Sequence, residues 1–295
     1  MDAPGLGYVV ETSDVRFFTG PGLRLAARIY QPNPQTDRNA GIVFCHGFGG
    51  NKEGTPPGLS NVLADHGYTV FTFDYRGFGE SEGPAGRMVQ TEQVEDTVHA
   101  IEYFAHQGGI DARRMGIYGT SFGAGIALLA ALRSGRPRAA FVTVPVTSGS
   151  GWLKSMNRLY EYQDMRARAF RAIAEKTVSG KMEMVDRFDI MVPDPLTRGR
   201  HTEKKPFALE TFYHIATYEP LAEAHNIHIP VGMIGIRDDI LVPFEQTAQL
   251  YERLAGPKHI HVFDHGHHHS VYNELLPAVA ERVMAWFDRY VSAEA

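Results

Sequence analysis

The chain has 295 residues, of which 43% are hydrophobic and 21% are charged, and its formal net charge is −5 at pH 7. This length suits one large α/β domain with an insertion, and the composition supplies a substantial buried core. The mild acidity and the lack of a long basic run argue against nucleic acid as a partner. No stretch reaches the roughly 18 consecutive apolar residues of a membrane-spanning helix, so no membrane partner is expected.

The amino-terminal sequence and the cysteine content bear on the compartment. MDAPGLGYVV lacks a basic segment followed by an apolar run, so we expect no signal peptide. Cys45 is the only cysteine, which excludes an internal disulfide and fits a reducing compartment. We therefore expect a cytoplasmic protein. Because Cys45 lies inside an apolar run, we expect it to be a small buried residue rather than a nucleophile.

Strand and helix patterns alternate over the first half of the chain. Two β-rich runs surround the turn signal Gly20-Pro21-Gly22 and predict antiparallel strands within the first 40 residues. Apolar runs predict buried strands at 41–47, 68–77, 114–121 and 139–147. Helical spacing predicts helices at 59–67, 91–109 and 122–135. This alternation predicts a parallel sheet with right-handed crossovers.

The alternation stops after residue 147 and resumes near residue 229. Residues 148–225 carry helical patterns, with an apolar stripe formed by Leu159, Tyr162, Met165, Ala169 and Ile173. We interpret this segment as a helical lid or cap, inserted into a core that comprises residues 1–147 and 226–295. The core continues with strands at 229–236 and 259–264 and helices at 245–256 and 278–291. A homo-oligomer would be expected to form contacts through the amino-terminal strands or the lid.

A serine between two glycines follows the third buried strand. Gly119, Ser121 and Gly123 fit the pattern G-x-S-x-G, with a strand before the serine and a helix after it. Such a sharp turn exposes the serine hydroxyl, and the glycines remove Cβ atoms that would clash there. The helix N-terminus favours negative charge beside the serine. The pattern predicts that Ser121 is a nucleophile, although an N-cap serine would fit the same turn.

A serine nucleophile needs an oxyanion site, a base and an orienting acid. For the oxyanion, the glycine-rich sequence HGFGG after the first buried strand predicts the backbone N–H of Phe48, together with that of Phe122. The alternative for HGFGG is an ordinary glycine-rich turn. His46, which precedes the turn, is expected to be structural, as are Asp74 and Arg76 at the end of the next strand.

The acid and the base are expected beyond the lid, after the last two strands. Asp238 and Asp239 are adjacent candidates for the acid, and only one of two neighbours on an extended segment can face the base. The sequence DHGHHH, residues 264–269, supplies four candidate histidines for the base. A histidine run also suggests metal binding, but adjacent histidines on a short loop rarely converge on one ion. We therefore expect neither a metal nor a cofactor.

The combined motifs resemble those of the α/β-hydrolase superfamily. The similar stretches are HGFGG, FDYRGFGESEG, GTSFGAG, DDILVP and GHHHSVY, in that order along the chain. The resemblance implies an α/β-hydrolase fold, with a mostly parallel central sheet flanked by helices. Within the superfamily, the chain is similar to serine esterases near the dienelactone-hydrolase and prolyl-oligopeptidase-like groups, and to polyketide-associated hydrolases. Dienelactone hydrolases use a cysteine at the position of Ser121.

The resemblance also selects among the neighbouring candidates. Such relatives carry Asp-x-x-x-Pro after the acid strand, a spacing that fits Asp239 and not Asp238. They tend to carry His-x-x-x-Tyr after the base strand, and this pattern fits His268. A second pattern in such relatives, a histidine directly after a glycine, fits His267 instead. The implied triad is Ser121, Asp239 and His268, with Asp238 and His267 as alternatives.

We therefore expect a serine hydrolase that cleaves a carboxylic ester, or a related acyl bond, of a small organic substrate. The same triad would also serve a C–C bond hydrolase, a thioesterase or acyltransferase, or a peptidase. A non-enzymatic binding protein that kept the fold is disfavoured, because every catalytic part is present. Trp152, Met156 and Tyr160 are candidate substrate contacts in the lid, but such residues could equally form the lid's own core.

Overall fold

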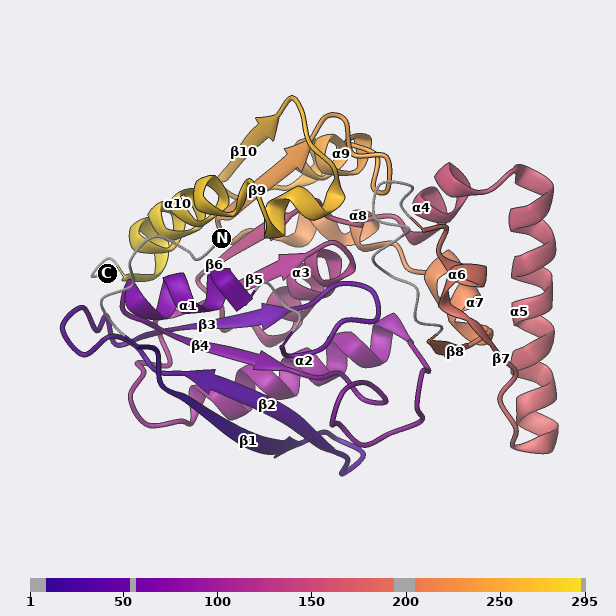
Figure 1. The fold of residues 1–295 in the computed structure, drawn as a ribbon, viewed down its shortest axis with the longest axis horizontal. Coiled ribbons are helices and arrows are strands. Elements are labelled where there is room, and N and C mark those ends of the chain that lie inside the picture. The colour runs from indigo at the N-terminus through magenta and orange to yellow at the C-terminus, as the bar shows by residue number, and fades with distance from the viewer. Residues whose placement is uncertain (1–8, 54–56, 194–204, 293–295) are drawn as a thin grey trace.

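The computed structural model describes residues 9–53, 57–193 and 205–292. Its centre is an eight-stranded sheet in the order β1-β2-β4-β3-β5-β6-β9-β10 (Figure 1). In that order the strands span Thr12–Phe18, Arg24–Tyr30, Tyr68–Phe73, Ala40–Cys45, Met115–Thr120, Ala139–Thr143, Val231–Ile236 and Lys258–Phe263. β2 pairs antiparallel with both β1 and β4, and all other neighbours pair in parallel. The predicted antiparallel start and parallel core are both confirmed.

Helices cover both faces of this sheet. One buried cluster joins α1 (Pro57–Asp65) and α10 (Leu276–Phe287) to one face. A second cluster joins α2 (Gln90–Ala105), α3 (Phe122–Ser134) and α9 (Glu245–Arg253) to the other face. The strands β3, β4, β5, β6 and β9 are buried along their whole length, because helices on both sides exclude water.

The segment predicted as a lid lies beyond the ends to which β3 and β4 point (Figure 1). It contains α4 (Gly149–Met156), α5 (Leu159–Ser179), α6 (Arg187–Ile190), α7 (Glu210–Ala216), α8 (Pro220–Glu223) and a 3-10 turn (Ala224–Asn226). It also contains the antiparallel strands β7 (Met184–Asp186) and β8 (Pro206–Ala208). The helix α5 stands at the edge of the molecule, with α6 and α7 between it and the sheet.

The apolar stripe predicted on α5 is only partly correct. Tyr162 and Ala169 are buried as predicted, and Ala172 is buried beside them. Leu159, in contrast, is 65% exposed. Met165 and Ile173 are half-buried, and Leu159 is the first residue of α5.

Several boundaries of the core differ from the prediction, and two of them have a clear cause in the backbone. The helix predicted over 91–109 ends at Ala105, because a backbone hydrogen bond to Tyr103 O tightens its last turn. The strand β6 ends at Thr143, because the φ of Val144 is 42° and no strand continues through that conformation. Among the described residues, none of the helices combines the length and the apolar character needed to cross a bilayer.

Candidate active site

Ser121 occupies the turn between β5 and α3. Its φ of 55° lies in the left-handed region, which is unfavourable for a residue other than glycine and must be held by its surroundings. The Ser121 N–H donates to Thr143 O at 2.9 Å, and the Ser121 carbonyl accepts from the N–H of Val146 at 3.0 Å. These bonds fix the turn against β6. They place the serine at the carboxyl end of β5, in the geometry that the G-x-S-x-G pattern predicts.

The two glycines of the pattern are required by a close approach of backbones. A Cβ at Gly119 would lie 2.5 Å from Gly123 O, and a Cβ at Gly123 would overlap Cys45 O. Any larger residue would therefore push α3 away from β3 and β5. Glycine permits the tight strand-to-helix turn because it has no Cβ.

Two further side chains form a chain of contacts that begins at Ser121. His268 Nε2 lies 3.1 Å from Ser121 Oγ, and His268 Nδ1 lies 2.8 Å from Asp239 Oδ2. Asp239 lies in the loop after β9, and His268 begins a 3-10 turn after β10. All three side chains are buried. An imidazole placed in this way can accept the serine proton at Nε2 while the carboxylate holds its Nδ1–H.

The surroundings of Asp239 favour its ionised form. Asp239 Oδ1 accepts the backbone N–H of Leu241 at 2.8 Å and that of Val242 at 3.0 Å. Burial by itself would raise the pKa of Asp239. The interaction with His268 and the two backbone hydrogen bonds outweigh it, so the pKa of Asp239 lies below its usual value. The carboxylate is therefore charged at neutral pH and stabilises the imidazole of His268 when that ring gains a proton.

The alternative acid and base form pairs of their own. Asp238 Oδ2 lies 2.9 Å from Nδ1 of His265, whose side chain is 91% exposed. His267 Nε2 lies 3.5 Å from Glu274 Oε1. The structure therefore brings neither Asp238 nor His267 into contact with Ser121.

The backbone next to Ser121 offers two N–H groups. A Cβ at Gly47 would lie 3.2 Å from Ser121 Cβ, so the loop after β3, which carries Phe48, passes directly beside the serine. Phe122 is the first residue of α3, and its N–H is one of the donors that a helix leaves unpaired at its start. Neither the Phe48 N–H nor the Phe122 N–H has an acceptor among the residues that the structure describes.

The three candidate lid residues lie at different depths. Trp152 is buried, with its ring 4.7 Å from that of Phe122, and its Nε1–H donates to Leu241 O at 2.9 Å. Met156 is half-buried, and Tyr160 is 62% exposed. Of the three, Trp152 therefore contacts both the serine turn and the loop of the candidate acid, whereas Tyr160 lies at the surface.

One aromatic residue near the site was missed by the sequence analysis. Phe207, in β8, stacks on Phe48 with ring centroids 4.9 Å apart and an interplanar angle of 8°. A Cβ at Gly49 would lie 2.8 Å from the same ring. The strand β8 has only three residues, too few for a periodic pattern to identify it. The contact joins the lid segment to the loop that carries the Phe48 N–H.

Other residues considered from the sequence have structural positions. Cys45 is buried, and burial raises the pKa of its thiol to about 12. Asp74 accepts the backbone N–H of Lys52 at 2.6 Å, and Arg76 donates to Asp96 at 2.8 Å. Within the described part of the chain, no three His, Cys, Asp or Glu side chains are placed to hold a metal ion.

Known proteins are similar to this chain over most of its length. The family described as "Serine aminopeptidase, S33" matches residues 36–275. An uncharacterized 31.7 kDa protein of Escherichia coli, from the traX-finO intergenic region, is 28% identical over 264 residues, covering 85% of this chain and 91% of that protein. Thiohydrolase aneE of Aspergillus aculeatus is 27% identical over 305 residues, covering 95% of this chain and 92% of that protein. The structure of the α/β hydrolase GrgF from Penicillium sp. sh18 matches the fold with a TM-score of 0.83 and 20% identity, and the match covers 96% of this chain and 100% of GrgF.

Proposed function

Because the chain belongs to the serine aminopeptidase S33 family of α/β hydrolases, we propose that it acts through an acyl-enzyme on Ser121. The bond cleaved would be a carboxylic ester, or a related acyl bond, of a small organic substrate. The observation that carries the proposal is the chain of contacts from Ser121 Oγ through His268 to Asp239. A serine hydroxyl is a weak nucleophile at neutral pH, and this arrangement supplies the base that it needs.

The proposed reaction has two halves that use the same groups. Ser121 Oγ attacks the acyl carbon while His268 Nε2 takes its proton, and Asp239 stabilises the charged imidazole. The N–H groups of Phe48 and Phe122 bind the oxyanion, and one such donor is typically worth about 3 kcal/mol in the transition state. His268 then gives its proton to the leaving group, which departs and leaves an ester on Ser121. Water, deprotonated by the same imidazole, hydrolyses that ester and frees the serine.

We also propose that residues 148–225 act as a lid that selects the substrate. Trp152 is bonded to the loop of the candidate acid, and Phe207 is stacked on the loop of the candidate oxyanion donor. The segment thus touches both sides of the serine turn. Its aromatic contacts with Phe48 and Phe122 support an apolar acyl group, because apolar walls favour apolar ligands.

The relatives suggest two neighbouring reactions. A thiohydrolase aligns over nearly the whole chain, which supports a thioester as the related acyl bond. The description of the matching family names an aminopeptidase, so an amide substrate is the second candidate. All three reactions share the acyl-enzyme and differ in the leaving group.

Hydrolysis of p-nitrophenyl esters, from acetate to decanoate, tests the acyl-enzyme. We expect Ser121→Ala to lose about 10⁴-fold or more in kcat, because the nucleophile is removed. The control Ser13→Ala changes an exposed serine of β1 and should keep the wild-type rate. Equal rates for wild type and Ser121→Ala would contradict the proposal.

The leaving group is tested with three substrates that share one acyl group. An acyl p-nitrophenyl ester, an acyl thioester and an acyl p-nitroanilide are compared by kcat/KM, and an aminoacyl p-nitroanilide is added for the aminopeptidase. We expect the ester or the thioester to be the best substrate. Faster turnover of either anilide would replace the proposed esterase with a peptidase that uses the same Ser121.

A further inference from the structure

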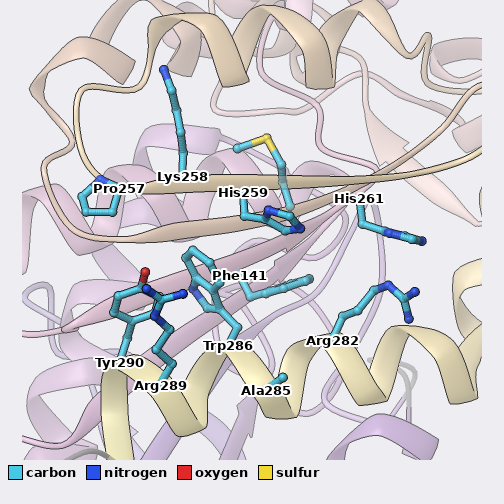
Figure 2. A pocket seen from close by; sticks show the side chains of 11 residues that line it. Phe141, Pro257, Lys258, His259, His261, Arg282, Ala285, Trp286, Arg289 and Tyr290 are labelled. Carbon is cyan, nitrogen blue, oxygen red and sulfur yellow. The ribbon is translucent and has the colours of Figure 1, made fainter.

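An open groove lies between β10 and α10 (Figure 2), and we call it the α10 groove. β10 is an edge strand of the sheet, whereas α10 lies over the inner strands, where Trp286 packs on Phe141 with ring centroids 6.4 Å apart. His259 and His261 are two residues apart on β10, so they share the face that α10 leaves partly uncovered. The groove has a volume of about 530 Å³, within the range of small-molecule sites.

Two arginines lie along the helical wall of the groove. Arg282 lies in α10, and Arg289 lies in the short π-helix (Asp288–Ser292) that follows α10 directly. Seven residues of helix span about 10 Å, and both arginines line the groove. Ala285 lies between them, and its small side chain leaves the wall open there (Figure 2). His259 and His261 extend from β10 on the opposite side. The groove therefore has a permanent positive charge towards each end and an imidazole wall facing the helix.

The positive charge in the groove is only partly neutralised. Arg282 lies 3.3 Å from Glu281, whose side chain is 77% exposed, and an exposed pair of this kind is weak. Arg289 stacks on Tyr290 at 5.1 Å and forms no ion pair among the described residues. Lys258 also lines the groove, but its ammonium turns away and donates to Leu254 O at 2.8 Å.

Nearby charges also act on the histidine wall. Burial is the main cause that lowers the pKa of His261, the charges of Arg282 and His259 lower it further, and the charge of Glu281 acts in the opposite direction. An anion bound in the groove would raise the pKa of His261 and would relieve the repulsion between its protonated ring and Arg282.

The floor of the groove is aromatic. It is formed by Phe141, Trp286 and Tyr290, and Trp286 is only 8% exposed. The indole N–H of Trp286 has no acceptor among the described residues, although buried polar groups normally have one. Rings of this kind stack with planar ligands and supply much of the contact area of small-molecule sites.

We propose that the α10 groove binds an organic anion with a planar ring system and two acidic groups, one held by Arg282 and the other by Arg289. A guanidinium binds carboxylate or phosphate oxygens through paired hydrogen bonds, so we expect the two acidic groups of the ligand to be carboxylates or phosphates. The ring lies across Ala285 and against the aromatic floor. None of the residues that line the groove belongs to the proposed triad or oxyanion site, so this inference does not rest on the proposed function.

Isothermal titration calorimetry of the whole protein with biphenyl-4,4′-dicarboxylate tests the two arginines. We expect affinity to fall about tenfold or more in Arg282→Gln and in Arg289→Gln, because each loses a charge-assisted hydrogen bond. The control Arg253→Gln changes an exposed arginine outside the groove and should bind like wild type. No binding of the diacid to wild type, or equal affinity in wild type and both groove variants, would overturn the proposal.

Shorter and simpler ligands test the two-acid arrangement. Biphenyl-4-carboxylate has one acidic group and should bind about tenfold more weakly than the diacid, since it engages one arginine only. Sebacate has two acidic groups at a comparable separation and no ring, and should bind more weakly than the biphenyl diacid because it makes no aromatic contact. A monoacid or sebacate that binds as tightly as the biphenyl diacid would contradict the proposed ligand class.

Ala285→Leu tests the placement of the ring without changing any charge. The larger side chain fills the opening between the arginines, so we expect diacid affinity to fall about tenfold. Ala285 is exposed, so the melting temperature and the hydrolysis of p-nitrophenyl acetate should stay at wild-type values. Unchanged diacid affinity in Ala285→Leu would place the ligand elsewhere and overturn the proposal.

Discussion

The proposed active site and the proposed lid, residues 148–225, are held in place by different kinds of contact. The three residues of the proposed triad follow the parallel strands β5, β9 and β10, and backbone hydrogen bonds fix both the serine turn and the candidate acid. In contrast, the longest lid helix, α5, buries only Tyr162, Ala169 and Ala172 among its 21 residues. Backbone geometry therefore sets the positions of the reacting atoms, whereas a few side chains set the position of the lid. With this arrangement, the sequence of the proposed lid can change without moving the proposed catalytic residues.

After the loss of Ser121 itself, the largest effect on kcat should come from the candidate acid. Asp239→Asn keeps the size of the side chain but removes the charge that orients His268 and stabilises its protonated form, so we expect kcat to fall about 10⁴-fold. The adjacent control, Asp238→Asn, changes an exposed residue paired with His265 and should stay within about twofold of wild type. Hydrolysis of p-nitrophenyl acetate measures both variants. Equal losses in the two would show that the site is not held by Asp239 as described.

The next largest effect, on the free energy of unfolding, should come from the backbone packing beneath the serine turn. Gly123→Ala places a Cβ against Cys45 O, so we expect the free energy of unfolding to fall by about 3 kcal/mol. At Gly108 a Cβ meets nothing within 4 Å, so the control Gly108→Ala should change stability by less than about 1 kcal/mol. Urea denaturation compares the two. Equal stabilities would contradict the direct packing of α3 on β3.

In the proposed lid, one buried carboxylate should contribute much of the stability of the contact with the core. Glu210 of α7 is buried and bonds to Arg87 of the core and to Lys176 of α5. We expect Glu210→Gln to lower the free energy of unfolding by about 2 kcal/mol. The control Glu183→Gln removes an exposed pair with Arg168 and should cost less than about 1 kcal/mol. A larger loss in Glu183→Gln would mean that surface charges hold the lid.

The pH dependence of the same variant sharpens this prediction. Burial by itself would raise the pKa of Glu210, but Lys176 and Arg87 outweigh it and hold that pKa below its usual value. The folded-state pKa thus lies below that of the unfolded chain, and ionised Glu210 stabilises the fold above about pH 4.5. The stability difference between wild type and Glu210→Gln should be constant near neutral pH and shrink as the pH falls below about 4.5. A difference that grew with acidification would contradict the assigned contacts.

The smallest effect should come from the stacked pair between the proposed lid and the loop of the proposed oxyanion donor Phe48. Phe207→Ala removes the ring that rests on Phe48, so we expect kcat/KM to fall about tenfold, which corresponds to about 1.4 kcal/mol. Phe170 lies on α5 with 56% of its surface exposed, and the control Phe170→Ala should keep wild-type kinetics. Equal losses in the two variants would mean that the lid acts as one unit rather than through Phe207.

The fold and the serine turn could be predicted because short-range rules govern them. Strand and helix periods identify the parallel core, and Ser121 is marked by glycines whose role is local backbone space. The choice between Asp238 and Asp239 depends on side-chain direction in an irregular loop, so the residues alone left it open. Phe207 was missed because its partner Phe48 is distant in the sequence. The end of β6 was missed because the left-handed φ of a β-branched valine has no sequence signal.

Mass spectrometry of the protein after reaction with a fluorophosphonate tests the proposed acyl-enzyme most directly. We predict a single covalent adduct on Ser121 of the wild type, no adduct in Ser121→Ala, and much slower labelling of Asp239→Asn than of Asp238→Asn. An adduct on a different residue, or an active wild-type protein that forms no adduct, would contradict the assignment of Ser121 as the nucleophile.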